Sequence, residues 1–138
     1  MRSQTYPAEV APQPVIPSFA GGRDLVSMRD LSPIEVESLF HLTSLVKTRP
    51  EDFRTALAGR HIAMFFEKPS LRTRITFEAG VFGLGGTVSF IDQRQERLDA
   101  RQSLSDIAHN LERWVSAIVL RTFAHETSKA WLNMHAFR

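Results

Sequence analysis

The stretch that decides the fold is "HIAMFFEKPSLRTRITFEAGVFGLGGTVSFID", residues 61–92. It opens with a short, nearly unbroken apolar run at 61–67, which is typical of a buried strand in a parallel sheet. Pro69 and the serine after it end the run. Apolar residues at helical spacing then predict a helix, which the glycines at 83–86 end. Residues 87–92 alternate β-formers and predict a second strand.

Helices and strands continue to alternate on both sides of this stretch. Upstream, Ser32, Pro33 and Glu35 match an N-cap, a first-turn proline and a capping box, which together predict a helix over 32–49. Downstream, the pattern predicts a polar loop at 93–102, a helix at 103–114, a strand at 116–123 with the clearest buried pattern in the chain, and an amphipathic segment at 125–137. This alternation favours an α/β fold, a parallel sheet with flanking helices.

The composition limits what kind of protein this is. The chain has 138 residues, 43% of them hydrophobic and 23% charged, which is enough for one globular domain with a sizeable core. Its 17 Lys and Arg against 15 Asp and Glu are nearly balanced, so the bulk charge does not argue for a nucleic-acid partner, and we expect none. The absence of cysteine excludes disulfides and thiolate metal sites, and the histidines show no metal spacing. We therefore expect no metal and no cofactor.

The ends of the chain and its location follow from the same kind of reading. Residues 1–22 contain four prolines, close on Gly-Gly and lack the features of a secretory signal, which predicts a flexible extension. No apolar stretch approaches the ~20 residues of a membrane span, so we expect no membrane partner. A cytoplasmic protein is the simplest interpretation.

Residues at the start of the central helix have the chemistry of an oxyanion site. In an open parallel sheet, ligands lie beyond the carboxyl ends of the strands, where helix N-termini offer backbone N–H groups and partial positive charge. Ser70 and Thr73 add hydroxyl donors, and Arg72 can hold two oxygens of a phosphate or carboxylate. Arg121 ends another predicted strand and is expected on the same edge. Together these residues predict an anion site, above all for phosphate.

Simpler interpretations of the same residues stay open. Ser70 could be an ordinary N-cap, and Arg74 with Glu78 forms a routine i,i+4 pair on a helix surface. The second arginine, at 121, favours the anion site. A nucleic-acid module built on the Arg-Thr-Arg segment lacks aromatic platforms and a basic stripe.

The segment "FFEKPSLRTRITFEAGVFGLGG" resembles the Ser-x-Arg-Thr-Arg signature of the aspartate/ornithine carbamoyltransferase family. "FEKPSLRTR" is most similar to the ornithine branch, and "SLSDIAHNLERWVSAIVLRTF" is similar to the family's next helix and strand. The likeness spans residues 24–126. It implies that 23–138 is the family's N-terminal, carbamoyl-phosphate-binding domain.

The resemblance also implies roles for single residues. The family's phosphate-binding positions correspond to Ser70, Leu71 through its backbone, Arg72 and Thr73, and the arginine that contacts the carbamoyl group corresponds to Arg121. Arg72 and Arg121 are then the catalytic residues. The implied reaction is attack by the δ-amine of ornithine on carbamoyl phosphate, giving citrulline and phosphate in a homotrimeric enzyme. Aspartate or N-acetylornithine as acceptor stays open.

The sequence also departs from the family. These residues include neither the His-Pro-Cys-Gln nor the Ser-Met-Gly segment of the family's amino-acid-binding domain, and "SKAWLNMHAFR" at 128–138 leaves the family pattern. In the loop at 93–102, Asp99 and Gln102 stand where the family has a Gly-rich turn, an acidic residue and serine. We therefore expect a truncated domain that is inactive alone. The alternative is a non-catalytic protein that keeps only anion binding or subunit contacts.

Overall fold

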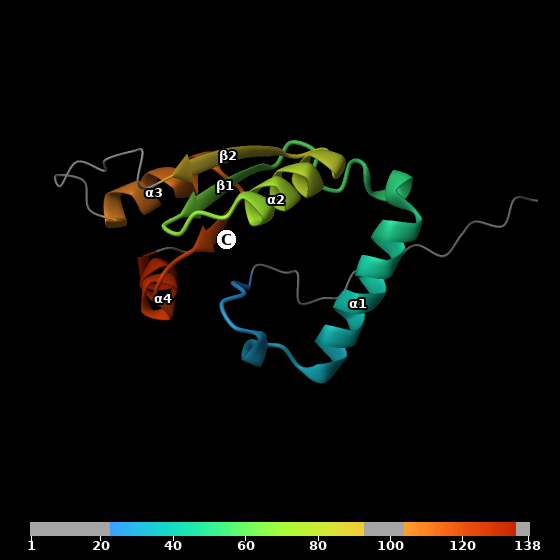
Figure 1. The fold of residues 1–138 in the computed structure, drawn as a ribbon, viewed down its shortest axis with the longest axis horizontal. Coiled ribbons are helices and arrows are strands. Elements are labelled where there is room, and N and C mark those ends of the chain that lie inside the picture. The colour runs from blue at the N-terminus through green and yellow to red at the C-terminus, as the bar shows by residue number, and fades with distance from the viewer. Residues whose placement is uncertain (1–22, 93–103, 135–138) are drawn as a thin grey trace, which may run out of the picture.

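The computed structural model describes residues 23–92 and 104–134, and the expectations for 1–22, 93–103 and 135–138 lie outside this part. The elements alternate as predicted (Figure 1): 3-10 helix η2 (Met28–Asp30), α1 (Pro33–Thr48), 3-10 helix η3 (Pro50–Phe53), β1 (His61–Phe66), α2 (Leu71–Gly83), β2 (Thr87–Asp92), α3 (Leu104–Trp114), β3 (Ala117–Arg121) and α4 (His125–Met134). The strands form a sheet in the order β2-β1-β3, and both pairings are parallel. The predicted α/β class is confirmed.

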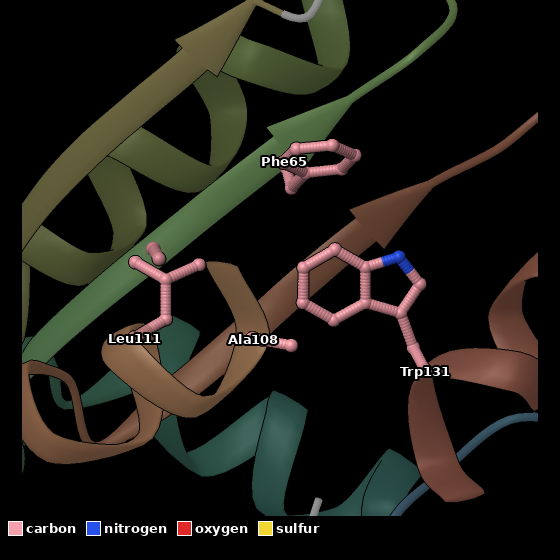
Figure 2. Close-up of a cluster of buried hydrophobic side chains, with 5 residues drawn as sticks. Phe65, Ala108, Leu111 and Trp131 are labelled. Carbon is pink, nitrogen blue, oxygen red and sulfur yellow. The ribbon is translucent and has the colours of Figure 1, made fainter. Parts of the chain in front are cut away.

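One face of the sheet is covered by α3 and α4. Phe65 of β1 packs against Trp131 of α4 with ring centroids 5.0 Å apart, and Ala108 and Leu111 of α3 complete the buried cluster (Figure 2). Ala63, two residues before Phe65, belongs to the same cluster because alternate residues of a strand point to the same face.

The opposite face of the sheet packs against α2. Met64 and Phe66 of β1 point to this face and are 0% and 1% exposed. The ring of Phe66 meets that of Phe90 in β2 edge to face, with centroids 5.2 Å apart. Val81 is the buried side chain that α2 contributes. The central strand is therefore enclosed between helical layers, which accounts for its unbroken apolar sequence.

The prediction that 116–123 is the clearest buried strand was wrong. β3 covers only Ala117–Arg121, and its residues are exposed or half-buried, whereas β1 is buried from Ile62 to Phe66. The physical reason is position in the sheet: β3 pairs with β1 alone, so within the described residues one of its sides has no neighbouring strand.

The apolar side chains of two of the predicted helices are largely uncovered. In α2, Leu71 and Ile75 are 74% and 54% exposed although their spacing suits an inner face. No residue of α1 is buried, and this helix lies away from the sheet (Figure 1). Capping signals and helical spacing therefore predicted these helices without predicting what covers them.

Local signals at helix ends were reliable. Ser32 Oγ accepts a hydrogen bond from the Glu35 N–H over 3.3 Å, and Glu35 Oε2 accepts one from the Ser32 N–H over 2.7 Å, so the predicted capping box is present. After α2 the chain turns through Gly85, whose φ of 83° is strained for any residue with a side chain. Among the described helices, none has the length and apolarity needed to cross a membrane.

Candidate functional site

The carboxyl ends of the strands bring the predicted site residues to one edge of the sheet. At this edge, Phe66 of β1 pairs with Asp92 of β2 and with Arg121 of β3. The helix α2 starts at Leu71, shortly after β1 ends. The predicted placement of Arg121 on the same edge as the start of α2 is confirmed.

Arg121 also points to the same face of the sheet as α2. Paired residues of parallel strands project to the same side, and Arg121 is the partner of Phe66, whose ring lies on the α2 face. Leu120, the preceding residue, packs instead against the cluster under α3 and α4. The Arg121 side chain therefore leaves the end of β3 on the side where α2 begins.

The N-terminus of α2 differs from that of α1. Ser70 occupies the N-cap position of α2, but its side chain makes no capping hydrogen bond within the described residues. Its hydroxyl donates instead to Thr73 Oγ1 over 2.8 Å, in a partly buried contact. The first turn of α2 contains no acidic residue either, whereas the first turn of α1 contains Glu35.

This arrangement leaves donors at the start of α2. The first helical hydrogen bond runs from the Arg74 N–H to the Ser70 carbonyl oxygen, so the N–H groups of Leu71, Arg72 and Thr73 precede the helical ladder. Arg72 is exposed, and in the part of the chain that the structure describes its guanidinium makes no hydrogen bond or ion pair. These groups carry the positive end of the helix dipole and a full positive charge.

Arg121 carries an unusual buried donor. Its Nε atom is buried and has no hydrogen-bond partner among residues 23–92 and 104–134. A buried N–H without an acceptor costs about 1–3 kcal/mol, and more when the group is charged. An acceptor oxygen placed beside this atom would remove that cost. The geometry therefore suits a ligand oxygen at the end of β3.

The second arginine of the motif, Arg74, is engaged in packing. Its guanidinium lies over the ring of Phe90, 4.0 Å from the centroid, and its Nε donates to Glu78 Oε1 over 2.8 Å. The expected i,i+4 pair of Arg74 with Glu78 is thus present, and Arg72 takes no part in it. Of the two arginines in the motif, only Arg72 is left for a ligand.

The structure adds one residue to which the sequence pattern gave no role. Glu67 follows β1 directly, and its Oε2 accepts a hydrogen bond from the Phe123 N–H over 2.9 Å. Its own N–H donates to the Arg121 carbonyl oxygen, also over 2.9 Å. The sequence feature that could have indicated a role for Glu67 is its place directly after an apolar strand, next to a predicted anion site where a carboxylate is unfavourable.

The histidines lie elsewhere. His61 is at the amino end of β1, where its ring nitrogens contact Thr87 Oγ1 at 2.7 Å and Ser89 Oγ at 2.9 Å. Across the described ranges, no group of three or more His, Asp or Glu side chains gathers as metal ligands. The loop residues Asp99 and Gln102 lie outside the described residues.

Comparison with known proteins places this arrangement in a family context. Residues 23–136 match the model of the aspartate/ornithine carbamoyltransferase carbamoyl-phosphate-binding domain. An ornithine carbamoyltransferase of Vibrio sp. (strain 2693) is 40% identical over 104 residues, which cover 75% of this chain and 35% of that protein. The chain thus corresponds to about a third of the length of this curated relative.

Solved structures agree on the fold. The crystal structure of ornithine carbamoyltransferase from Thermus thermophilus superposes with a TM-score of 0.72 at 39% identity, covering 80% of this chain and 38% of that one. An aspartate transcarbamoylase from Trypanosoma cruzi superposes with a TM-score of 0.75 at 22% identity, covering 83% and 38%. At that lower identity the likeness concerns the fold alone.

Proposed function

Because the chain belongs to the aspartate/ornithine carbamoyltransferase family through its carbamoyl-phosphate-binding domain, we propose that the edge formed by β1, β3 and the start of α2 binds carbamoyl phosphate. The observation that carries the proposal is the uncapped N-terminus of α2 facing the same side as Arg121, whose Nε is buried without an acceptor. A dianionic phosphate with an attached carbonyl offers acceptors to both groups.

The phosphate end of the ligand is assigned to α2. The N–H groups of Leu71, Arg72 and Thr73, the hydroxyls of Ser70 and Thr73 and the Arg72 guanidinium supply donors and positive charge. Their hydrogen bonds and charge interactions become stronger as negative charge develops on the departing phosphate. Interactions that are stronger in the transition state than with bound substrate lower the activation barrier of the reaction.

The carbamoyl end is assigned to Arg121. A guanidinium N–H beside the carbonyl oxygen would withdraw electrons from the carbon and stabilise the oxyanion of a tetrahedral intermediate. The amine nitrogen then forms a bond to the carbon, the bond from carbon to the phosphate oxygen breaks, and the proton lost by the nitrogen passes to the departing phosphate. Orientation of the reactants and electrostatic stabilisation supply the catalysis.

Ornithine is the acceptor that the comparisons support. The relatives with 39–40% identity are named ornithine carbamoyltransferases, so we assign the reaction ornithine plus carbamoyl phosphate to citrulline plus phosphate. Aspartate and N-acetylornithine remain the alternative acceptors. A homotrimer and a cytoplasmic location belong to the same proposal, and sedimentation of the purified chain tests the first of these.

We further propose that these 138 residues alone provide half of an active site. They include neither the His-Pro-Cys-Gln nor the Ser-Met-Gly segment that the family resemblance assigns to amino-acid binding. Purified chain supplied with ornithine and carbamoyl phosphate should therefore bind the latter without forming citrulline. Steady citrulline production by this chain would contradict the half-site proposal and leave the binding assignment intact.

Calorimetric titration with carbamoyl phosphate tests the binding site directly. Arg72→Ala should weaken binding by about 10- to 100-fold, because a charged hydrogen-bonding pair contributes about 1.5–3 kcal/mol. The matched control is Arg74→Ala, which removes the same kind of side chain two positions away, where it packs on Phe90.

The control should change affinity by less than about threefold, since a purely packing role contributes little to ligand contacts. Equal and negligible effects of both substitutions would favour the interpretation that Ser70 and its neighbours only form the start of a helix. Binding of carbamoyl phosphate without any turnover, even when an amino-acid-binding domain of the family is added, would favour the non-catalytic alternative.

A further inference from the structure

Glu67 presents a problem that the proposed function does not solve. Its carboxylate lies at the edge where a phosphate is expected, and a negative charge there repels an anionic ligand. The side chain is half-buried, not extended freely into solvent. A residue of unfavourable charge at a binding edge calls for another role.

The contacts of Glu67 define that role. Its N–H donates to the Arg121 carbonyl oxygen over 2.9 Å, which is the last hydrogen bond of the β1–β3 ladder. Its carboxylate accepts from the Phe123 N–H over 2.9 Å. Glu67 therefore holds the chain on both sides of Thr122, directly after the point where the Arg121 side chain leaves β3. A carboxylate accepting from a backbone N–H forms a stronger hydrogen bond than a neutral acceptor does.

The same segment is held from the other side by α4. Thr122 Oγ1 donates to the Ala124 carbonyl oxygen over 2.8 Å and lies 2.9 Å from Ser128 Oγ. The Arg121 guanidinium itself makes no hydrogen bond or ion pair within the described residues, and its Nε is buried. Its direction is therefore set by the backbone and by packing, and the backbone is fixed by Glu67 and Thr122.

We propose that Glu67 is a positioning residue that fixes the exit of β3 and thereby aims the Arg121 guanidinium at the carbonyl oxygen of the bound ligand. The inference rests on the proposed function, because it assigns the carbonyl to Arg121. It gives the carboxylate no contact with the ligand. It also explains why an acidic side chain is compatible with an anion site: its charge is directed at a backbone N–H.

The experiment compares two ligands on the same variants of the full 138-residue chain. Carbamoyl phosphate uses both ends of the site, whereas inorganic phosphate uses only the groups at the start of α2. Glu67→Ala should weaken the binding of carbamoyl phosphate about tenfold, because the displaced Arg121 guanidinium loses a hydrogen bond to the ligand of about 1.4 kcal/mol. The affinity for inorganic phosphate should change by less than about twofold. Glu67→Gln, which keeps an acceptor oxygen, should recover most of the lost affinity.

A double-mutant cycle separates positioning from general loss of structure. On an Arg121→Ala background, Glu67→Ala should have no further effect on carbamoyl phosphate, because the group that it positions is gone. The Phe123 amide proton should also move upfield in Glu67→Ala and stay near its place in Glu67→Gln. Additive effects in the cycle, equal loss of both ligands, or a Glu67→Gln variant as weak as Glu67→Ala would overturn the inference.

The two proposals fail in different ways. If the unaltered chain binds no carbamoyl phosphate, the proposed function fails and this inference fails with it. If the unaltered chain binds carbamoyl phosphate and Glu67→Ala binds it equally well, only the positioning role is overturned.

Discussion

Ser70 Oγ donates a hydrogen bond to Thr73 Oγ1 over 2.8 Å, so the hydroxyl at the N-cap of α2 is directed at another side chain and caps no backbone N–H. Ser32, at the N-cap of α1, accepts from the Glu35 N–H. Serine thus occupies the same helix position twice in this chain with different consequences. One helix start is closed by its own residues, and the other retains donors for a ligand.

The first prediction follows from this contrast. Ser70→Ala should change the free energy of unfolding by less than about 1 kcal/mol, since it removes one side-chain hydrogen bond. It should weaken carbamoyl phosphate binding about tenfold, because the Ser70 hydroxyl would turn from Thr73 to donate to a charged ligand oxygen, and the variant loses that donor. Urea denaturation and calorimetry measure the two effects. Ser32→Ala is the matched control and should lower stability with no effect on binding; the reverse pattern would contradict the assignment.

The second prediction concerns Arg74. Its contact with Phe90 and its partly exposed ion pair with Glu78 together stabilise the packing of α2 on β2 by about 1 kcal/mol. Arg74→Ala should lower the free energy of unfolding by that amount, as measured by urea denaturation. Arg74→Lys keeps the charge and should recover only part of this stability, since it lacks the planar group that lies on the ring. A loss of ligand affinity as large as that of Arg72→Ala would show that Arg74 belongs to the site.

The third prediction concerns the turn between α2 and β2. Gly85 has a φ of 83°, and a Cβ there would overlap the Arg54 carbonyl oxygen. Gly85→Ala should therefore destabilise the chain by more than about 1 kcal/mol. Gly80 lies within α2 with open space around it. Gly80→Ala should stabilise by about 0.5–1 kcal/mol through helix propensity, as thermal unfolding would report. Equal destabilisation by both changes would refute the account of this turn.

The fourth prediction is a pH dependence at the start of α1. Hydrogen bonds from the Ser32 backbone and side chain, with the nearby charge of Arg23, lower the pKa of Glu35. The pKa of Glu35 is lower in the folded chain than in the unfolded chain, so ionised Glu35 adds to the free energy of unfolding. This stabilisation is complete above about pH 4.3, the usual pKa of an unfolded glutamate, and is lost as the pH falls through the folded pKa. An NMR titration of Glu35 should give a lowered midpoint that Ser32→Ala moves part of the way back up, because the variant loses the hydroxyl and keeps the backbone N–H. An unchanged midpoint in that variant would exclude the Ser32 hydroxyl as a cause and leave the backbone N–H of residue 32.

Local patterns predicted the parts of the fold that depend on neighbours in sequence. The capping box at Ser32, the buried run of β1 and the start of α2 after Ser70 were all read from adjacent residues and are present. The edge position of Arg121 followed from one general rule, that parallel strands share their carboxyl ends. These features need no knowledge of which elements pack together.

The features that were missed depend on contacts distant in sequence. The burial of β3 was overestimated because its apolar sequence does not reveal that the strand lies at the edge of the described sheet. The hydrogen bond from the Phe123 N–H to Glu67 joins residues 56 positions apart, so no local pattern could indicate it. The exposure of Leu71 likewise depends on what covers α2, which helical spacing leaves open.

The central claim is that the start of α2 and Arg121 act on one ligand. An NMR titration of the labelled chain with carbamoyl phosphate tests it most directly. The account predicts that the backbone N–H signals of residues 71–73 and the Nε–H signal of Arg121 shift together in one saturable step, while the Nε–H signal of Arg74 stays in place. Shifts confined to other residues, or an unmoved Arg121 signal at saturation, would contradict the claim.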